Sequence, residues 1–292
     1  MPALYVVATP IGNLADMTPR AIETLKSVSL IAAEDTRVTR KLLNAFGIHT
    51  PLVSCREHNE RTVALRIVKR MLEEGIDVAC TTDAGTPCLS DPGSGLVREA
   101  ANAGIPVIAV PGASAIAAAL SVSGMDIEEF TFYGFLPRQR GELREKLKDM
   151  ARTSRVAVVF ESPYRVIDLL ACLAESLPHT RVCVHCDLTK KYENTLRGEV
   201  IEALEVLQNN PKAEKGEYCL VLQWDPQDIP REEERAVSLE AMVFNGLVEG
   251  LSLRESMERL IAAGERRNAV YAVGIKVKAM LAPLAAGKGE VR

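Results

Sequence analysis

Short apolar runs alternate with amphipathic segments over the first 124 residues of the chain. Residues 4–9 are apolar and β-branched and end at Pro10 and Gly12, which is typical of a buried strand. The same alternation predicts further strands at 29–33, 77–81 and 106–110, and helices at 18–26, 60–74, after 91–93 and at 113–122. Because strands that alternate with helices of roughly 10–15 residues indicate βαβ units, this half predicts a mainly parallel sheet.

The pattern becomes more mixed after Gly124. Strands are predicted at 130–135, 156–160, 181–187 and 218–224, and helices at 140–151, 164–176 and 199–209. The last strand follows a loop at 211–216, and we expect it to pair antiparallel. A polar, acidic segment at 225–237 predicts a linker, and three helices are predicted beyond it, at 238–248, 252–263 and 267–281. The predicted fold class is therefore α/β, with two α/β domains (1–123 and 124–226) and a small helical domain (236–292).

Composition places the chain among globular proteins of more than one domain. Its 292 residues are 47% hydrophobic and 25% charged. No apolar run reaches the ~18–20 residues that span a bilayer, so no membrane association is predicted. The first ten residues lack a basic region and a small-residue cleavage site, and the seven cysteines form no evenly spaced framework. These features predict a cytoplasmic protein with free thiols.

Charge is distributed unevenly around a net value of -4. Residues 138–155 hold seven Lys or Arg against three acids, and residues 254–292 hold eight against four, a net of +4 in each case. Residues 225–240 hold six acids against two Arg, a net of -4. Two interpretations stay open: solvated helix faces with a linker, or two basic surfaces for a phosphate backbone separated by an acidic hinge.

Three predicted strand ends in the first half carry loops of Gly, Pro and small residues. These loops are 9–14, 83–87 with its continuation at 90–93, and 111–115. In open α/β sheets ligands bind beyond the carboxyl ends of the strands, and small residues let the backbone approach a flat ligand closely. A single loop of this kind is ordinary turn chemistry. Three at one edge of a sheet indicate a ligand site.

Common nucleotide and metal motifs do not account for these loops. Only Gly12 follows the first strand, where a dinucleotide site would have G-x-G-x-x-G, and no G-x-x-x-x-G-K-[ST] segment is present. NAD and ATP are therefore not predicted as ligands. The C-x-x-C spacing at 183–186 has no second pair beside it, so no metal is predicted.

Two polar clusters follow strands in the first half, at 34–37 and 56–61. In the simpler interpretation each supplies a helix N-cap with surface charges, with Asp35 or Thr36 as the cap in the first cluster and Asn59 in the second. In the alternative interpretation both clusters line one rim of the ligand site. Arg37 would then hold a phosphate, and His58 would accept a proton.

At these residues the sequence resembles a known family. The chain is similar to the bacterial 2′-O-ribose methyltransferases I of small-subunit ribosomal RNA, a branch of the tetrapyrrole (corrin/porphyrin) methylase superfamily. The resemblance covers roughly residues 4–224. The segments that carry it are LYVVATPIGNLADMTPRA (4–21), AEDTR (33–37), HNE (58–60), DAGTPCLSDPGSGLV (83–97), VPGASAIAAALSVSG (110–124), FYGFLPR (132–138), ESPYR (161–165) and LTKKYE (188–193).

The resemblance implies an enzyme with S-adenosylmethionine as cofactor, bound in a cleft between two α/β domains. Positions that match the superfamily's cofactor loops are Ile11, Gly12, Asp83, Gly85, Thr86, Gly112, Ser114 and Ala115. The implied reaction is methylation of a ribose 2′-hydroxyl, that of a cytidine, in 16S ribosomal RNA. The implied partners are the small ribosomal subunit and a second copy of the chain, without a metal.

A sugar hydroxyl is a weak nucleophile, so a proton acceptor helps its attack. We expect His58 in this role first, and Glu34 or Asp35 next, with Arg37 positioning a phosphate. Two other functions stay open. A tetrapyrrole C-methyltransferase would use the same fold, and a ribosome-assembly factor would bind without catalysis. Incubation with labelled cofactor and either ribosomal RNA or a tetrapyrrole distinguishes the C-methyltransferase from the RNA methyltransferase. Calorimetry with S-adenosylmethionine identifies the assembly factor, for which no cofactor binding is expected.

Overall fold

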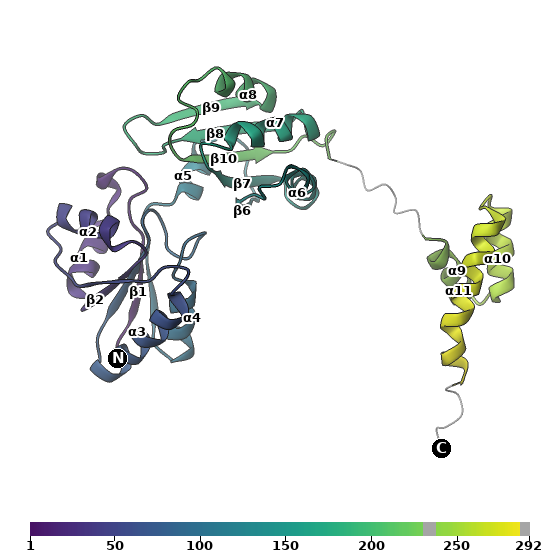
Figure 1. The fold of residues 1–292 in the computed structure, drawn as a ribbon, viewed down its shortest axis with the longest axis horizontal. Coiled ribbons are helices and arrows are strands. Elements are labelled where there is room, and N and C mark those ends of the chain that lie inside the picture. Colours follow the sequence, from purple (N-terminus) through teal and green to yellow (C-terminus); the bar gives the residue numbers. More distant parts are fainter. Residues whose placement is uncertain (230–237, 287–292) are drawn as a thin grey trace. The chain divides into compact units, whose positions relative to one another are not determined.

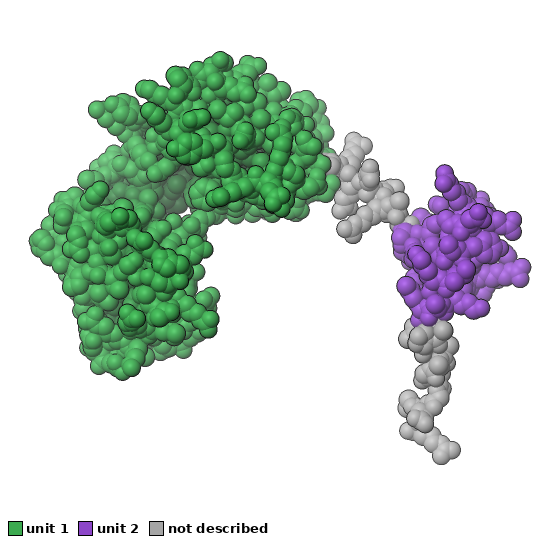
Figure 2. Space-filling view, in the orientation of Figure 1, with its two compact units in different colours: residues 1–229 green, residues 230–292 purple. Residues whose placement is uncertain are grey.

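The computed structural model describes residues 1–229 and 238–286. The chain forms two compact units, residues 1–229 (unit 1) and 230–292 (unit 2), which Figure 2 shows in green and purple. Part of the predicted acidic linker, 230–237, and the end of the chain, 287–292, lie outside the described residues. Unit 1 contains two five-stranded sheets (Figure 1), so the α/β class with a helical C-terminal part is confirmed. The boundaries of the three predicted domains stay a prediction.

The first sheet is entirely parallel, in the order β3-β2-β4-β1-β5. Its strands are β1 (Leu4–Val7), β2 (Leu30–Ala33), β3 (Leu52–Ser54), β4 (Val78–Thr81) and β5 (Val107–Val110). One face packs against α1 (Pro19–Ser27) and α2 (Thr36–Ala45), and the other against α3 (Glu60–Glu74) and α4 (Ser94–Asn102). A short 3₁₀ helix, η1 (Leu14–Asp16), precedes α1. We call β1–β5 with α1–α4 lobe A. Since β4, β1 and β5 are neighbours, their carboxyl ends meet.

The second sheet has the order β6-β7-β10-β8-β9, with β6 and β7 parallel and the other pairs antiparallel. Its strands are β6 (Thr131–Phe135), β7 (Val156–Glu161), β8 (Arg181–Cys186), β9 (Asn194–Glu199) and β10 (Tyr218–Gln223). One face is covered by α6 (Arg140–Thr153), α7 (Val166–Ser176) and α8 (Val200–Gln208). The opposite face receives α5 (Ala115–Ser121). We call β6–β10 with α5–α8 lobe B.

Helix α5 follows β5 of the first sheet directly but packs on the second sheet. Its buried Ala119 lies in one apolar cluster with Val158, Cys183 and Val221 of three different strands. Small side chains dominate this helix, so its backbone comes close to the sheet. The third predicted loop, which lies between β5 and α5, therefore connects the edge of one sheet with the face of the other.

Unit 2 is a bundle of α9 (Leu239–Val248), α10 (Leu253–Ala262) and α11 (Arg267–Ala286) in the described residues. Its small core gathers around Val243, Val273 and Val277. Helices α9 and α10 approach closely, since a Cβ on Gly246 would lie 2.4 Å from Ser256 Oγ. None of the helices in the described ranges is both long and apolar enough to cross a membrane.

The sequence predicted most elements within one or two residues, and the antiparallel pairing of β10 is confirmed. It missed β3 and β9. Strand β3 has three residues, and β9 is a polar edge strand whose side chains are mostly exposed or half-buried. Neither segment has the apolar run on which the prediction depended.

Candidate active site

The three glycine- and proline-containing loops of lobe A are hydrogen-bonded to one another. The Thr9 N–H donates to Gly85 O (2.8 Å), and the Gly85 N–H donates to Thr9 O (3.0 Å). The Thr86 hydroxyl donates to Ala113 O (3.2 Å), which joins the second loop to the third. Loops that lie far apart in the sequence thus form one rim at the carboxyl edge of the sheet, as the strand order β4-β1-β5 requires.

A pocket of about 340 Å³ opens beside this rim and is lined by both lobes of unit 1. Lobe A contributes Ile11, Ala84, Gly85, Thr86, Leu89 and Asp91. Lobe B contributes Ser114 and Ala115 at the start of α5, and residues that include Phe160, Glu161 and Tyr218 from β7 and β10. The volume falls within the range of roughly 300–1,000 Å³ that is usual for small-molecule sites.

Five of the eight residues predicted to bind the cofactor line this pocket, and three do not. The lining residues are Ile11, Gly85, Thr86, Ser114 and Ala115, and the others are Gly12, Asp83 and Gly112. Gly112 lies against the first loop, where its Cβ would come within 3.1 Å of Ala8 Cβ. Asp83 directly precedes the lining residue Ala84.

Gly12 lies where the first loop of lobe A contacts lobe B. A Cβ at this position would lie 2.4 Å from Lys190 Cγ and 2.9 Å from the backbone oxygen of Leu188, which itself lines the pocket. The lysine stem can move, but the backbone oxygen cannot move without its loop. The glycine therefore permits a close approach of the lobes next to the pocket.

We expect Gly12→Ala to weaken binding of a pocket ligand by about 5- to 150-fold, because overpacking of this kind costs ~1–3 kcal/mol. Calorimetric titration of the variant measures the change. Gly141→Ala is the matched control, since a Cβ at this position in α6 has no neighbour within 4 Å. Equal affinities for Gly12→Ala and Gly141→Ala would show that the contact with Leu188 does not shape the pocket.

Backbone strain gathers in two loops that border the pocket. The only non-glycine residues with positive φ in the described ranges are Cys88 (72°), Ser90 (64°), Asp187 (55°) and Thr189 (63°). The first two belong to the second loop of lobe A, and the last two flank Leu188 in lobe B. Such conformations persist where the surroundings enforce them and are common at ligand sites.

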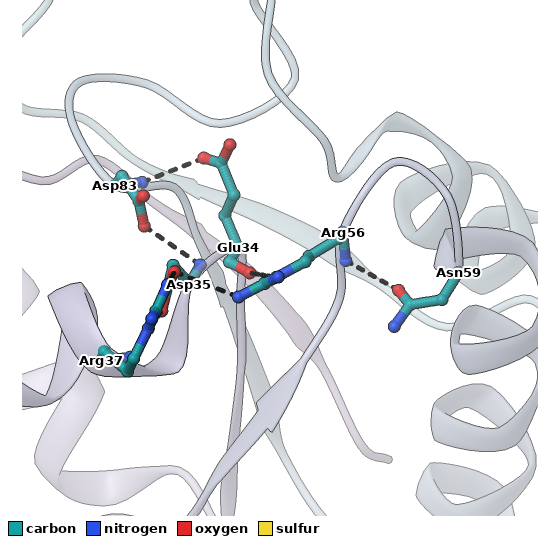
Figure 3. Close-up of polar contacts among 6 residues, drawn as sticks. All are labelled: Glu34, Asp35, Arg37, Arg56, Asn59 and Asp83. Carbon is teal, nitrogen blue, oxygen red and sulfur yellow. Dashed lines mark hydrogen bonds and ion pairs between the residues drawn. The ribbon is translucent and has the colours of Figure 1, made fainter.

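A network of carboxylates supports the rim (Figure 3). Glu34 Oε2 accepts from the Thr82 hydroxyl (2.6 Å) and from the Asp83 N–H (3.2 Å), while Asp83 Oδ1 accepts from the Asp35 N–H (3.1 Å). Burial raises the pKa of Asp83, and the charges of Glu34 and Asp35 raise it further. Two of the predicted catalytic acids, Glu34 and Asp35, thus position the second loop from outside the pocket.

Asp35 is also the N-cap of α2, one of the two residues that the simpler interpretation offers for this position. Its Oδ1 accepts from the Arg37 N–H (2.8 Å), and its Oδ2 lies 2.6 Å from Arg37 Nη2 and 3.0 Å from Arg56 Nη2. Hydrogen bonds from Arg37 hold the pKa of Asp35 well below its ordinary value. The side chain of Arg37 remains 81% exposed and is open to an external anion.

The second polar cluster lies at the start of α3. Asn59 is the N-cap residue of this helix, as the simpler interpretation predicted, but its side chain makes no cap bond, and its Oδ1 accepts from the Arg56 N–H instead (2.8 Å). Arg56 in turn donates from Nε to Glu34 O (3.2 Å), which joins the two clusters (Figure 3). His58 is exposed in the turn between Arg56 and Asn59, and it does not line the pocket.

Glu60 of the second cluster is the first residue of α3, but its carboxylate binds the N-terminus of α4. Its Oε1 accepts from the N–H groups of Gly93 (2.9 Å), Gly95 (2.6 Å) and Leu96 (3.3 Å), at the start of α4. A carboxylate at a helix N-terminus satisfies free backbone donors and complements the helix dipole. Glu60 therefore fixes the end of the second loop, which begins at Asp83.

Three acidic residues that were not among the predicted site residues line the pocket: Asp91, Glu161 and Glu217. Burial and the nearby charge of Glu34 raise the pKa of Asp91 to about 6. Burial also raises the pKa of Glu161, although its Oε1 accepts from the Ser162 N–H (2.8 Å) and its Oε2 lies 3.2 Å from Arg165 Nη2. Perturbed carboxyl groups in a pocket are typical of functional sites. The signal in the sequence was the acid within each loop motif, SDPG for Asp91 and ESPYR for Glu161.

The C-x-x-C segment at 183–186 lies on β8, and two of its side chains contact each other in the protein interior. Cys183 and His185 are buried and face each other, with Sγ and Nε2 3.2 Å apart. Within the described ranges no group of three His, Cys, Asp or Glu side chains has an arrangement that could hold a metal ion.

Comparison with known proteins identifies the class to which this fold and pocket belong. The family Tetrapyrrole (Corrin/Porphyrin) Methylases matches residues 3–204. The solved uroporphyrin-III-C-methyltransferase from Thermus thermophilus superposes with a TM-score of 0.52 and covers 78% of this chain and 96% of its own. At 19% identity this likeness shows the fold alone.

Two curated relatives are much more similar, and both are named Ribosomal RNA small subunit methyltransferase I. The protein from Halalkalibacterium halodurans is 45% identical over 230 residues, which cover 79% of this chain and 78% of the relative. The protein from Neisseria meningitidis serogroup B is 42% identical over 279 residues, which cover 94% of each chain. The chain therefore belongs to the tetrapyrrole methylases and, among them, to the family of small-subunit ribosomal RNA methyltransferases I.

Proposed function

We propose that this protein transfers a methyl group from S-adenosylmethionine to a ribosomal RNA of the small subunit, and that the acceptor is the ribose 2′-hydroxyl of a cytidine in 16S RNA. The observation that carries the proposal is the pocket at the joined ends of three loops, shared by both lobes. The names of relatives at 42–45% identity support the choice of acceptor.

The residues around the pocket fit this cofactor. Glu161 is a buried carboxylate in the wall, and a buried negative charge suits a ligand with a positive sulfonium and ribose hydroxyls. Gly85 and Gly216 have φ of 82° and 95°, and a Cβ on Gly216 would collide with Cys186 Sγ at 2.7 Å. Both present bare backbone to the pocket, beside apolar walls that suit an adenine ring.

We propose the eight predicted positions, from Ile11 and Gly12 through Asp83, Gly85 and Thr86 to Gly112, Ser114 and Ala115, as the lobe-A and α5 part of the cofactor site. When bound, S-adenosylmethionine supplies an activated methyl group on a positively charged sulfur. The protein aligns the acceptor oxygen with that methyl group, and alignment of this kind can lower a barrier by ~7–11 kcal/mol. The pocket walls also exclude water from the reacting groups.

The acceptor hydroxyl has to lose its proton. Asp91 lines the pocket, and its pKa of about 6 lets the carboxylate accept a proton near neutral pH. His58 is the alternative acceptor from the sequence, at the exposed turn beside Arg56. We assign Glu34 and Asp35 to the support of this rim, and the exposed guanidinium of Arg37 to a phosphate of the RNA.

Basic surfaces supplement the site. Helix α6 buries Leu143, Leu147 and Met150 and turns most of the basic residues of 138–155 outward. A small subunit that is already assembled can present its shape as well as its phosphates, so a net acidic enzyme needs only local positive charge. We also propose that the protein acts in the cytoplasm as a homodimer.

One experiment tests the function. Small subunits from a strain that lacks this protein are incubated with the purified protein and S-adenosylmethionine, and 2′-O-methylation is mapped along 16S RNA. We expect one cytidine to become methylated, and only after the protein is added. Methylation of a tetrapyrrole instead of RNA would favour the C-methyltransferase, and calorimetry without S-adenosylmethionine binding would favour a non-catalytic assembly factor.

A further inference from the structure

The β6 strand carries a bulge that turns an aromatic side chain toward the pocket. In its pairing with β7, Phe132 lies opposite Val158 and Phe135 opposite Phe160, while Gly134 lies opposite Val159. Tyr133 is therefore the extra residue. Side chains alternate along a strand, so residues 132 and 135 would normally lie on opposite faces. The bulge places both on the α5 face, where their rings contact Phe160 with centroids 4.9 and 5.9 Å away.

The same bulge forms a contact between the lobes. Gly134 has φ of 63°, and a Cβ on it would lie 2.9 Å from Ser90 Oγ of lobe A. Ser90 also has a positive φ. Leu89 and Phe135 each lie one residue from this contact, and both line the pocket. Leu89 remains 45% exposed and Phe135 61% exposed.

We propose that Leu89 and Phe135 hold the nucleobase of the target nucleotide at the mouth of the pocket, with the base stacked on the Phe135 ring. The inference rests on the proposed function, because it requires RNA as the acceptor. Single-stranded RNA is recognised mainly through unstacked bases that stack on aromatic side chains. A base held at the mouth brings its own ribose to the pocket, since the two are covalently joined.

Exposure and charge favour a base of the acceptor over the adenine of the donor. A ring that is 61% exposed forms the mouth of the pocket, whereas the enclosed wall is made by residues such as Tyr218 and Cys219, which are 4% exposed. Arg138 is exposed three residues beyond Phe135 and supplies positive charge for the phosphate next to the base. Leu89 and Phe135 are thus substrate-positioning residues.

The test compares Phe135→Ala with Phe135→Tyr and Phe130→Ala. Phe130 is also an exposed phenylalanine in lobe B, but it lines a different hollow near Glu129 and Arg155, so its variant is the matched control. Single-turnover methylation of small subunits gives kcat/KM, and calorimetry gives the affinity for S-adenosylmethionine. We expect Phe135→Ala to lower kcat/KM for the subunit by about 10- to 100-fold, mainly through KM, with the S-adenosylmethionine affinity unchanged. Phe135→Tyr should keep most of the kcat/KM of the unmodified protein.

Other outcomes overturn the inference. If Phe135→Ala methylates subunits normally, or if its S-adenosylmethionine affinity falls by the same factor as kcat/KM, the ring does not position the base. Leu89→Ser provides a second variant from the opposite lobe, for which we expect a smaller loss of the same kind. If the unmodified protein does not methylate subunits at all, the proposed function fails and the base site fails with it.

Discussion

Replacing Asp91 by Asn is expected to lower the rate of methyl transfer by about 10²- to 10⁴-fold, the usual contribution of a general base. The amide keeps the size of the side chain but cannot accept a proton. Asp91 lines the pocket, and its pKa is raised to about 6 because burial and the charges of Glu34 and Asp83 oppose its ionisation. Single-turnover methylation with saturating cofactor measures the rate.

The unmodified enzyme should also depend on pH in a specific direction. The reactive form of Asp91 is the ionised carboxylate, so the rate should be constant above pH 7 and fall about tenfold per pH unit below a pH of about 6. Asp126→Asn, which changes an exposed acid, should behave like the unmodified protein. A full rate for Asp91→Asn together with a large loss for His58→Ala would assign the proton to His58 instead.

Replacing Glu60 by Ala is expected to destabilise the protein by about 2–4 kcal/mol, because three backbone N–H groups at the start of α4 lose a charged acceptor. Denaturant unfolding measures the loss. Hydrogen exchange should speed up first at Gly93, Gly95 and Leu96. The second loop ends at this helix, so binding of S-adenosylmethionine should weaken as well.

Glu60→Gln separates the hydrogen bonds from the charge, since its amide oxygen can still accept from these N–H groups. We expect Glu60→Gln to lower the free energy of unfolding by less than half as much as Glu60→Ala does. Glu57→Ala, an exposed acid in the preceding turn, should leave stability within about 0.5 kcal/mol. A similarly small effect for Glu60→Ala would mean that α4 and its loop are held by packing alone.

The lobe-A half of the site could be predicted from the sequence because its signals are local. The predicted strands at 4–9, 77–81 and 106–110 are each followed by Gly, Pro and small residues, and parallel strands bring such ends to one edge. Hydrogen bonds between Thr9 and Gly85 and between Thr86 and Ala113 confirm that these loops meet.

The rest of the site could not be predicted in this way, because its residues act through tertiary contacts. Phe135 faces the pocket only because Tyr133 is an extra residue in the β6–β7 register, which no apolar alternation shows. Glu60 begins α3 in the sequence but stabilises α4 in space. Asn59 occupies the N-cap position of α3, but its side chain makes no cap bond because it accepts from the Arg56 N–H instead. Each outcome depends on which partner the fold brings close.

The account depends most on the pocket between the lobes of unit 1 as the cofactor site. A crystal structure of the protein with S-adenosylhomocysteine, the product of the methyl donor, tests this directly. We expect density for the nucleoside among Ile11, Thr86, Ser114 and Tyr218, with the positively charged ammonium group of the ligand toward Asp83 or Glu161. Density at any other place, or a pocket that stays empty in crystals soaked well above the measured dissociation constant, would contradict the account.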